Sequence, residues 1–448
     1  MKKLIYLIFP FVFSAHAIFS QSIDDSFSRK KMRKDLEVFK KIRIKANSGL
    51  YKYRSKAQID SIYHWAEKEI ESSNTYRDFC NIIYQLTDFE GSTHNWTSFS
   101  SKMWESLKEE EKGYFPFPIK LINGKVILNF ETNKIPLGAE LISINNQEIE
   151  EVIPNLYKYY TTDGLNITGK SIGVNYNFSG YYRLHYGLMD AFKISYKTQD
   201  SNEVFQTTLE SVSSANYYKN VENRYSKPFD EPHYKDWEEN EIYTYKNVDH
   251  STGILTINTF GIGNETTPEH KRFANFLDSI FVNINKEKIE NLIVDVRYNG
   301  GGTDPNDLVT YSYLTQRNFS ENKQAWISFE KIPYLKYLES NVPSFLRPLG
   351  VGKYNRLIQK EFPTEKDSGF FQNSTSSDHK VWTPNKNAFK GKIYLLISPR
   401  VASAGSLFAA MVAGNQNTVV IGEETMGGYY GHNGHTSMTY ILPKSKIK

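Results

Sequence analysis

The sequence predicts a multi-domain protein of mixed α/β class. Its 448 residues exceed the roughly 100–200 of a single domain, and 39% hydrophobic with 23% charged residues is typical of a globular chain. Apolar residues recur with a helical period from about residue 25 to 90, and short alternating runs follow from about 115 to 210. After about residue 250, buried strands alternate with helices, which indicates a largely parallel sheet.

The N-terminal residues 1–17, MKKLIYLIFPFVFSAHA, have the pattern of a secretory signal peptide. Two lysines precede an apolar run that ends before a small-x-small cleavage pattern. The run is too short for a stop-transfer helix, and no later stretch approaches about 20 apolar residues. We therefore expect an exported protein, periplasmic or secreted, without an integral membrane segment.

Residues 22–112 are predicted to form a helical N-terminal region of three helices. Asn47-Ser48-Gly49 separates the first two helices, and the third ends in the loop Asp88–Trp96. Cys80, the only cysteine, excludes an intramolecular disulfide. It lies at an apolar-periodic position of the third helix and is predicted to be a core residue.

Residues 113–210 are predicted to form a β-rich unit. Within it, the segment Ile135–Asn146 resembles the stretch of a PDZ domain that reads G-x-x-I-x-x-I-N-G, with Asn146 at the usual glycine position. We therefore expect a PDZ-like domain here. The polar and aromatic stretch at 211–245 is predicted to be a linker.

Residues 246–448 are predicted to form the α/β core. Its predicted strands are 254–257, 292–296, 393–397, 419–421 and 438–442, and its predicted helices cover about 268–285, a stretch beginning near 304, and a stretch beginning at Ser403. A long irregular insertion at 318–390 interrupts the alternation.

Ser403 lies between a buried strand and a buried helix, in the segment SPRVASAGSLFAAMVAG. A tight strand-to-helix turn can hold a hydroxyl at the end of a sheet beside free helix N–H groups, as a nucleophilic serine requires. The alternative is an ordinary helix N-cap, for which serine is among the preferred residues.

The segment Gly300-Gly301-Gly302 follows a buried strand directly and precedes the helix start Asp304-Pro305. Such a loop can turn backbone N–H groups outward to hold an anion. Neither of the two common nucleotide-binding glycine patterns fits these residues. A transient oxyanion, as in acyl transfer, is the other candidate, and a simple tight turn is the structural alternative.

Together with GEETMG at 422–427, these motifs resemble those of the C-terminal processing peptidases and the core of tricorn protease. The resemblance covers about residues 250 to 448 and implies a Clp-protease/crotonase-like core with serine peptidase activity. It makes Ser403 the nucleophile. It also implies an oxyanion hole formed by the N–H of Ala404 with that of Gly301 or its neighbour Gly300.

The two branches of the family use different residues as the general base, so the resemblance to one branch implies which residue acts here. Where one branch has a lysine after GEETMG, this chain has Gly428, so a serine–lysine dyad is not expected. The tricorn-like branch takes a histidine that follows a hydroxyl residue ahead of the core, and Thr93-His94 matches that pattern. Near neutral pH such a histidine can take the serine proton and return it to the leaving amine.

Other candidates for the site lie after the nucleophile. His432 and His435 are rival bases, and Glu423 is a possible acid; the two histidines lack a third ligand for a metal. Ser406 stands where many family members have glutamate. No Asp or Glu follows Glu424, so we expect the protein to continue beyond Lys448 and its acid partner to lie there.

The sequence therefore predicts an exported serine endopeptidase that cleaves protein or peptide substrates through an acyl-enzyme, without a cofactor. The alternatives are a catalytically weak peptide- or lipid-binding protein on the same fold, and an acyl-thioester enzyme that needs no nucleophilic serine. The formal net charge of +4 falls to +2 without the two signal-peptide lysines, which does not favour nucleic-acid binding. The oligomeric state stays open.

Overall fold

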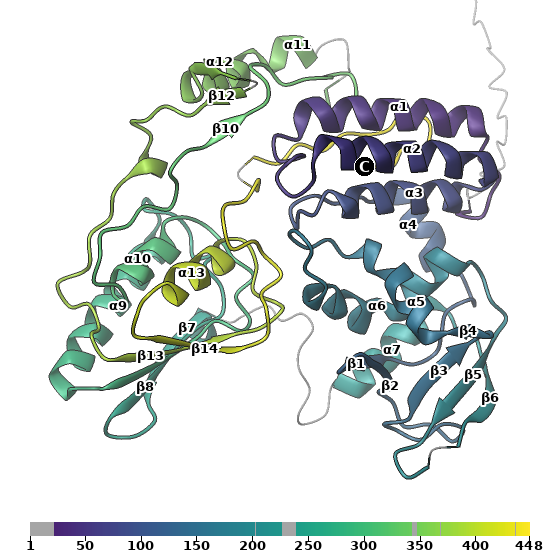
Figure 1. The fold of residues 1–448 in the computed structure, drawn as a ribbon, viewed down its shortest axis with the longest axis horizontal. Helices are drawn as coiled ribbons and strands as arrows, with labels where there is room; N and C mark the ends of the chain where they lie inside the picture. Colours follow the sequence, from purple (N-terminus) through teal and green to yellow (C-terminus); the bar gives the residue numbers. More distant parts are fainter. Residues whose placement is uncertain (1–21, 202, 226–238, 343–346, 368, 435) are drawn as a thin grey trace, which may run out of the picture.

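The computed structural model describes residues 22–201, 203–225, 239–342, 347–367, 369–434 and 436–448. The chain forms two lobes side by side (Figure 1). One lobe holds the N-terminal helices and an antiparallel sheet, and the other holds a mainly parallel sheet with its helices. The predicted signal peptide lies outside the described residues.

The three predicted N-terminal helices are present as α1 (Arg29–Ala46), α2 (Lys56–Ser72) and α3 (Tyr76–Phe89), followed by the short α4 (Ser101–Lys108). Ser55 and Thr75 begin α2 and α3 with reciprocal side-chain and backbone hydrogen bonds, which satisfy the first N–H groups of each helix. The apolar faces of α1–α3 form one core, in which Cys80 is buried as predicted.

The last residues of the chain pack on this helical core, where the sequence predicted a strand at 438–442. That prediction is wrong: Tyr440 makes only an isolated bridge to Leu338. Leu442 and Ile447 instead join the core of α1–α3, and Figure 1 shows the yellow segment running along these helices. Asp35 of α1 accepts the backbone N–H groups of Lys444 and Ser445. Burial of two apolar side chains thus competes successfully with strand pairing.

The unit predicted to be PDZ-like has an antiparallel sheet in the order β1-β2-β3-β5-β6, with β4 paired to β3. The strands are β1 (Ile119–Ile122), β2 (Lys125–Leu128), β3 (Glu140–Ile144), β4 (Gln147–Glu148), β5 (Ala191–Lys197) and β6 (Phe205–Glu210). The helices α5 (Ile149–Leu156) and α6 (Thr168–Tyr186) complete its core. The long α6 lies between β4 and β5 in sequence.

The segment predicted to be a linker contains regular structure. Residues Ser214–Tyr225 form α7, and after α8 (Glu239–Ile242) the strand β7 (Tyr243–Asn247) pairs with the core sheet. Tyr217 and Val221 of α7 are buried. Its polar composition hid this helix, because only a narrow apolar stripe is needed for α7 to pack on α6.

The core sheet has the order β14-β13-β9-β8-β7. Its strands β8 (Thr252–Ile257), β9 (Asn291–Asp295), β13 (Lys392–Ile397) and β14 (Thr418–Gly422) are parallel and follow one another in a single direction. Right-handed crossovers then place every connecting helix on the same face. Accordingly α9 (Pro268–Glu287), α10 (Asn306–Ser312) and α13 (Ala404–Ala413) lie together above the sheet in Figure 1.

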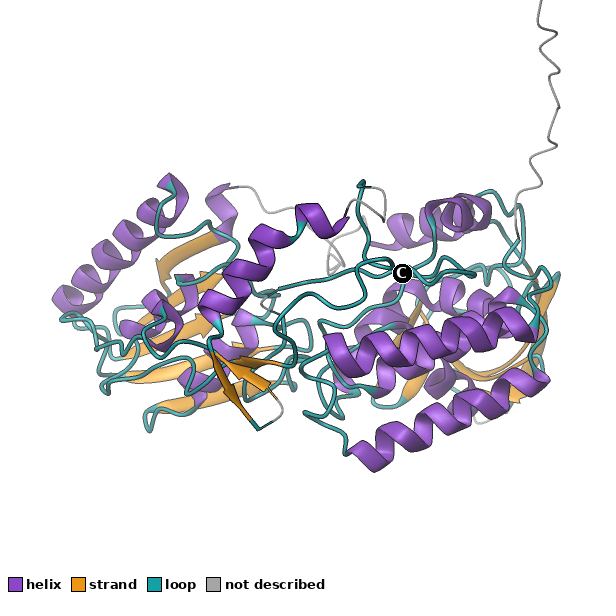
Figure 2. Cartoon of the chain, turned by 90° about the horizontal axis from the view of Figure 1, so that it is seen from above, coloured by secondary structure: helices purple, strands orange, loops and turns teal. Residues whose placement is uncertain are grey.

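The insertion between α10 and β13 has a small antiparallel sheet in the order β10-β12-β11. It comprises β10 (Trp326–Ile327), β11 (Thr364–Lys366) and β12 (Gly369–Phe371), with α11 (Arg347–Gly350) and α12 (Gly352–Glu361). Seen from above in Figure 2, these elements lie over the junction of the lobes. Among the described residues, no helix combines the length and apolarity that crossing a membrane requires.

The contact between Asp35 and the last residues predicts a measurable stabilisation. Asp35→Asn replaces one of the two accepting oxygens with an amide NH₂ that faces a backbone N–H. Burial already raises the pKa of Asp35, so the effect comes from the lost acceptor, and the free energy of unfolding should fall by about 2 kcal/mol. The control Glu37→Gln changes an exposed carboxylate of the same helix and should cost less than about 0.5 kcal/mol. Urea unfolding of both variants checks this, and equal midpoints would contradict it.

Candidate active site

The site lies where two neighbouring strands of the core sheet end. Strands β9 and β13 pair in parallel, so their carboxyl ends meet at one edge of the sheet. The loop after β9 contains Gly300–Gly302, and the loop after β13 contains Ser403. A Cβ at Gly301 would lie 2.7 Å from Ser403 Cβ, so the two loops are in contact.

Ser403 has a backbone conformation that serine rarely adopts. Its φ is 52° and its ψ is −130°, directly before the first residue of α13. Its side chain makes no capping hydrogen bond, which argues against the ordinary N-cap interpretation. Such strain persists only where the surroundings enforce it, and it is concentrated at functional sites. The side chain is only half-buried, so a substrate can reach it.

Small and polar neighbours support this turn. Any Cβ at Gly405 would overlap the carbonyl oxygen of Asn299, so the start of α13 packs directly on the glycine loop. Ser406 donates its hydroxyl to the carbonyl oxygen of Val401 at 3.0 Å. Ser406, three positions after Ser403, therefore holds the Ser403 turn in place through a hydrogen bond to the backbone.

His94 and Ser403 meet although 309 positions separate them. His94 Nε2 lies 3.1 Å from Ser403 Oγ, which is hydrogen-bonding distance. The histidine comes from the loop after α3, in the other lobe. Gly434 packs against the His94 ring so closely that any side chain there would overlap it.

A buried carboxylate holds the loop that contains His94. Glu90 is 2% exposed and pairs with Arg43 of α1. It also accepts the side-chain amides of Asn47 (3.1 Å) and Asn95 (2.7 Å). The loop is thus fixed on both sides of His94, because Ser92 donates to Asn433 Oδ1 at 2.7 Å. These hydrogen bonds therefore hold the Asp88–Trp96 segment in one position.

Asp163 is a residue of this site that the sequence did not indicate. Its carboxylate accepts the backbone N–H of Thr93 at 2.8 Å and that of Gly428 at 2.6 Å. It is 8% exposed. It joins the loop of His94, the loop after β14 and its own loop before α6. No spacing rule connects these three segments, so only the fold reveals the contact.

The pKa of His94 is below its usual value. Burial disfavours the charged imidazolium and is the largest cause, Asp163 opposes this by raising the pKa, and Lys52 lowers it further. Within the described part of the chain, the buried Nδ1 of His94 has no hydrogen-bond partner. The imidazole is therefore neutral near pH 7 and can accept a proton at Nε2.

The predicted oxyanion donors differ in their hydrogen bonds. The N–H of Gly301 donates to Asn299 Oδ1 at 2.9 Å and is occupied within the loop. Among the described residues, the N–H groups of Gly300 and Ala404 have no acceptor. Gly300 is exposed, and a Cβ there would meet nothing within 4 Å. Of the two glycines, Gly300 is the one whose N–H is open to a ligand.

The other predicted residues lie around this centre. Thr93 Oγ1 donates to the carbonyl oxygen of Thr161 at 3.5 Å. The ring centroid of His432 is 5.7 Å from that of His94, and His432 Nδ1 accepts the N–H of Gly434, whereas His435 lies outside the described residues. Glu423 is exposed and is not brought to His94 by any hydrogen bond.

Gly428, for which the sequence resemblance implied a lysine in the other branch, packs closely on two groups. A Cβ at Gly428 would lie 2.5 Å from the hydroxyl of Tyr53 and 3.2 Å from Asp163 Oδ2. Tyr53 is partly buried, and its pKa is raised to about 12 by burial and by Asp163. A longer side chain at position 428 would displace both groups, so the site has no room for a lysine there.

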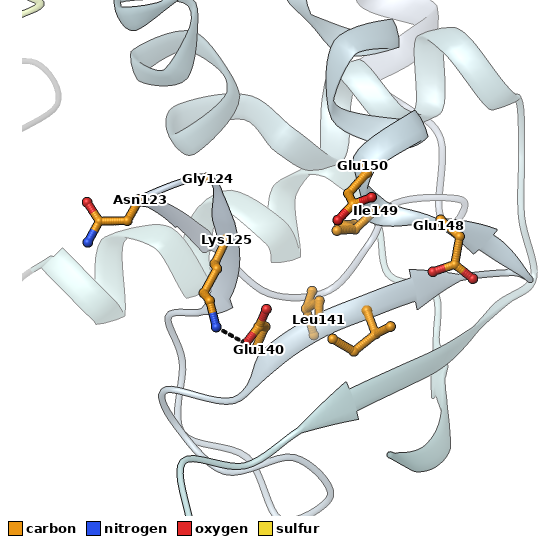
Figure 3. Close-up of a pocket in the computed structure, with 9 residues that line it drawn as sticks. Asn123, Gly124, Lys125, Glu140, Leu141, Glu148, Ile149 and Glu150 are labelled. Atoms are coloured by element: carbon orange, nitrogen blue, oxygen red, sulfur yellow. Dashed lines mark hydrogen bonds and ion pairs between the residues drawn. The ribbon is translucent and has the colours of Figure 1, made fainter. Parts of the chain in front are cut away.

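A separate hollow of about 330 Å³ lies in the antiparallel unit and not at the histidine–serine pair. Figure 3 shows it between the β1–β2 turn, β3 and the start of α5. Lys125 pairs with Glu140 across it at 2.7 Å, and Glu148 and Glu150 line its rim. The residues that line this hollow include no serine, threonine or cysteine that could act as a nucleophile.

Comparison with known proteins agrees with the fold. The family described as Peptidase family S41 matches residues 251–438. Mature CPAF complexed with lactacystin is 13% identical with a TM-score of 0.51, over 89% of this chain and 85% of that chain. A serine-to-alanine mutant of CPAF is 13% identical with a TM-score of 0.54, over 93% and 90%. No curated protein sequence matches.

The mixed α/β fold and the family match define a serine-type peptidase. The sequence motifs of the glycine loop, the Ser403 turn and the strand before Gly427 all fall inside the matched residues. Over residues 251–438 the chain is similar to peptidase family S41. Polypeptides are accordingly its class of substrate.

Gly405→Ala tests the close packing of α13 on the glycine loop. The added methyl must displace the Asn299 carbonyl, so we expect a stability loss of about 1–3 kcal/mol and at least a tenfold loss of peptidase activity. Gly350→Ala, where a Cβ meets nothing within 4 Å, is the matched control. Thermal unfolding and a peptide cleavage assay check this. Unchanged activity in Gly405→Ala would show that the turn tolerates displacement.

Proposed function

We propose that this protein is an endopeptidase that cleaves polypeptides through an acyl-enzyme on Ser403. The observation that carries the proposal is the 3.1 Å approach of His94 Nε2 to the hydroxyl of a serine held at positive φ. His94 takes the Ser403 proton as Oγ attacks the peptide carbonyl carbon. The same proton then passes to the leaving amine, and water releases the acyl group by the reverse sequence.

The proposed oxyanion hole consists of the N–H groups of Gly300 and Ala404. Support comes from their open hydrogen-bonding capacity and from the contact of the glycine loop with Ser403. The N–H of Ala404 is also at the N-terminus of α13, where the helix dipole favours negative charge. Two fixed donors of this kind stabilise the tetrahedral intermediate more than the planar substrate.

Asp163 is proposed to stabilise the charged form of His94. Its carboxylate raises the pKa of His94, and it fixes the loop of His94 through the N–H of Thr93. It does so through space and through the backbone, because no direct hydrogen bond joins it to the ring. This role differs from that of an acid bonded to Nδ1.

Ser403→Ala should abolish labelling by a fluorophosphonate and reduce cleavage of an unfolded protein substrate by about 10⁴-fold or more. Ser72→Ala, an exposed serine of α2, is the control. Mass spectrometry of the labelled peptide and a turnover assay check this. Unreduced cleavage by Ser403→Ala would refute the nucleophile, and absence of both activities in the native protein would favour a binding protein on the same fold.

The pH profile tests the base. Only neutral His94 accepts the proton, so activity should rise with pH through a single ionisation below the ordinary histidine value of about 6.5, since burial lowers the pKa. Asp163→Asn removes the charge that raises this pKa, so the acid limb should move to lower pH while the plateau falls. A purely structural role would lower the plateau without moving the limb. An acid limb in the lysine range would refute the assignment.

Export is proposed from the N-terminal sequence. Residues 1–17 have the signal-peptide pattern, which supports a periplasmic or secreted mature protein. Expression in a bacterial host followed by N-terminal sequencing should find mature protein beginning after Ala17. Full-length protein that keeps Met1 and stays in the cytoplasm would contradict this proposal.

A further inference from the structure

Three carboxylates converge at the end of the glycine loop, in a cluster that contains neither His94 nor Ser403. Asp304 follows that loop, Asp307 is on the first turn of α10, and Glu321 comes from the insertion. One carboxylate oxygen from each lies within 4.8 Å of the other two. The cluster thus joins the loop that contains Gly300 to a segment that is distant in sequence.

Asp307 is the unusual member of the cluster. Its side chain is 0% exposed, and within the described residues neither of its carboxylate oxygens has a hydrogen-bond partner. A buried carboxylate is normally neutralised by an opposite charge or a proton, or is satisfied by donors. Desolvation raises the pKa of Asp307 well above its usual range, and the negative charges of Glu321 and Asp304 raise it further, whereas the nearby backbone N–H groups of Leu308 and Asp307 lower it only in part.

The surroundings of Glu321 add to the negative charge. Burial raises the pKa of Glu321 to about 7, and Asp304 and Asp378 contribute in the same direction. Asp378 itself accepts the side-chain amide of Gln372 at 2.6 Å. Asp304 is exposed, whereas Glu321 is partly buried and Asp307 is fully buried. The three carboxylates repel one another, and a cation placed among them would remove this repulsion and satisfy the unpaired oxygens of Asp307.

We propose that Asp304, Asp307 and Glu321 bind one calcium ion. Calcium takes oxygen ligands at about 2.3–2.6 Å, so two of its ligands on opposite sides are about 5 Å apart. The separations within the cluster lie inside that limit, and one ion can reach all three carboxylates. Magnesium, with ligands at about 2.0–2.1 Å, demands shorter separations and a strict octahedron, whereas calcium accepts an irregular set of oxygen ligands, so we assign the site to calcium.

Bound calcium would connect the insertion to the core next to the glycine loop. Asp304 lies four positions after Gly300, and Thr303 donates its N–H to the carbonyl oxygen of Phe260 at 3.0 Å. Fixing Asp304 therefore restrains the segment that presents the N–H of Gly300. The binding site itself does not depend on the proposed peptidase mechanism.

The test uses the full-length protein after removal of metals with a chelator. Calorimetric titration with CaCl₂ should show one saturable site, and saturating calcium should raise Tm by roughly 5 °C or more. Asp307→Asn and Glu321→Gln should each weaken binding at least tenfold. Glu365→Gln, an exposed carboxylate of β11, is the control and should bind like the native protein.

Several outcomes would overturn the proposal. Absence of calcium binding by the native protein, or equal binding by the two variants, would show that the carboxylates are neutralised by protons instead. An equal rise in Tm with MgCl₂ would overturn the assignment to calcium. If Asp307→Asn does not fold, Glu321→Gln decides the result, since Glu321 is only partly buried.

Discussion

The hydrogen bond between His94 Nε2 and Ser403 Oγ joins two lobes that fold around different cores. The serine depends on the parallel sheet, which sets the strand-to-helix turn, and the histidine depends on the packing of α1–α3. A displacement of about 1 Å between the lobes would break the contact, because hydrogen bonds lose strength steeply beyond about 3.2 Å. The interface between the lobes therefore sets the distance between these two side chains.

Several polar groups hold the loop of His94 and that interface. Glu90 ties the loop to α1 through Arg43 within its own lobe, whereas the partly buried Asn433 reaches the same loop across the interface from the segment after β14. Asp163 adds a third attachment, since it bonds the backbone of both segments. Each of these groups is satisfied by backbone or side-chain donors, which lets them remain buried at a low energetic cost.

The electrostatics of the site balance opposing effects. Burial favours neutral His94, which suits proton acceptance, whereas the imidazolium of the proposed mechanism would need a nearby negative charge. Asp163 supplies that charge without contacting the ring. Lys52, which donates to the carbonyl oxygen of Gly431 at 2.7 Å, partly offsets it. The basicity of His94 is thus set by burial and by charged groups from two loops, neither of which is next to it in sequence.

The sequence by itself determined the local elements and the local motifs. Periodicity placed α1–α3, β3, β13 and α13, and small residues around Ser403 indicated a tight turn, because these features depend on neighbours within a few positions. The resemblance to a peptidase family selected His94 among the histidines. The sequence prediction missed the helix at 214–225 and wrongly expected a strand at 438–442. Both segments are shaped by the apolar surface on which they pack, and the local sequence does not reveal that surface.

Only the tertiary structure decided how distant groups combine. It showed that Gly301 donates within its own loop and leaves Gly300 open, that Asp163 reaches two loops, and that Asp307 lies buried beside two other carboxylates. The bonds of Asp163 span 70 and 265 positions, and even the contacts between near neighbours depend on how the surrounding loops pack. Their distances are set by the packing of whole helices and strands, and no spacing rule along the chain encodes them.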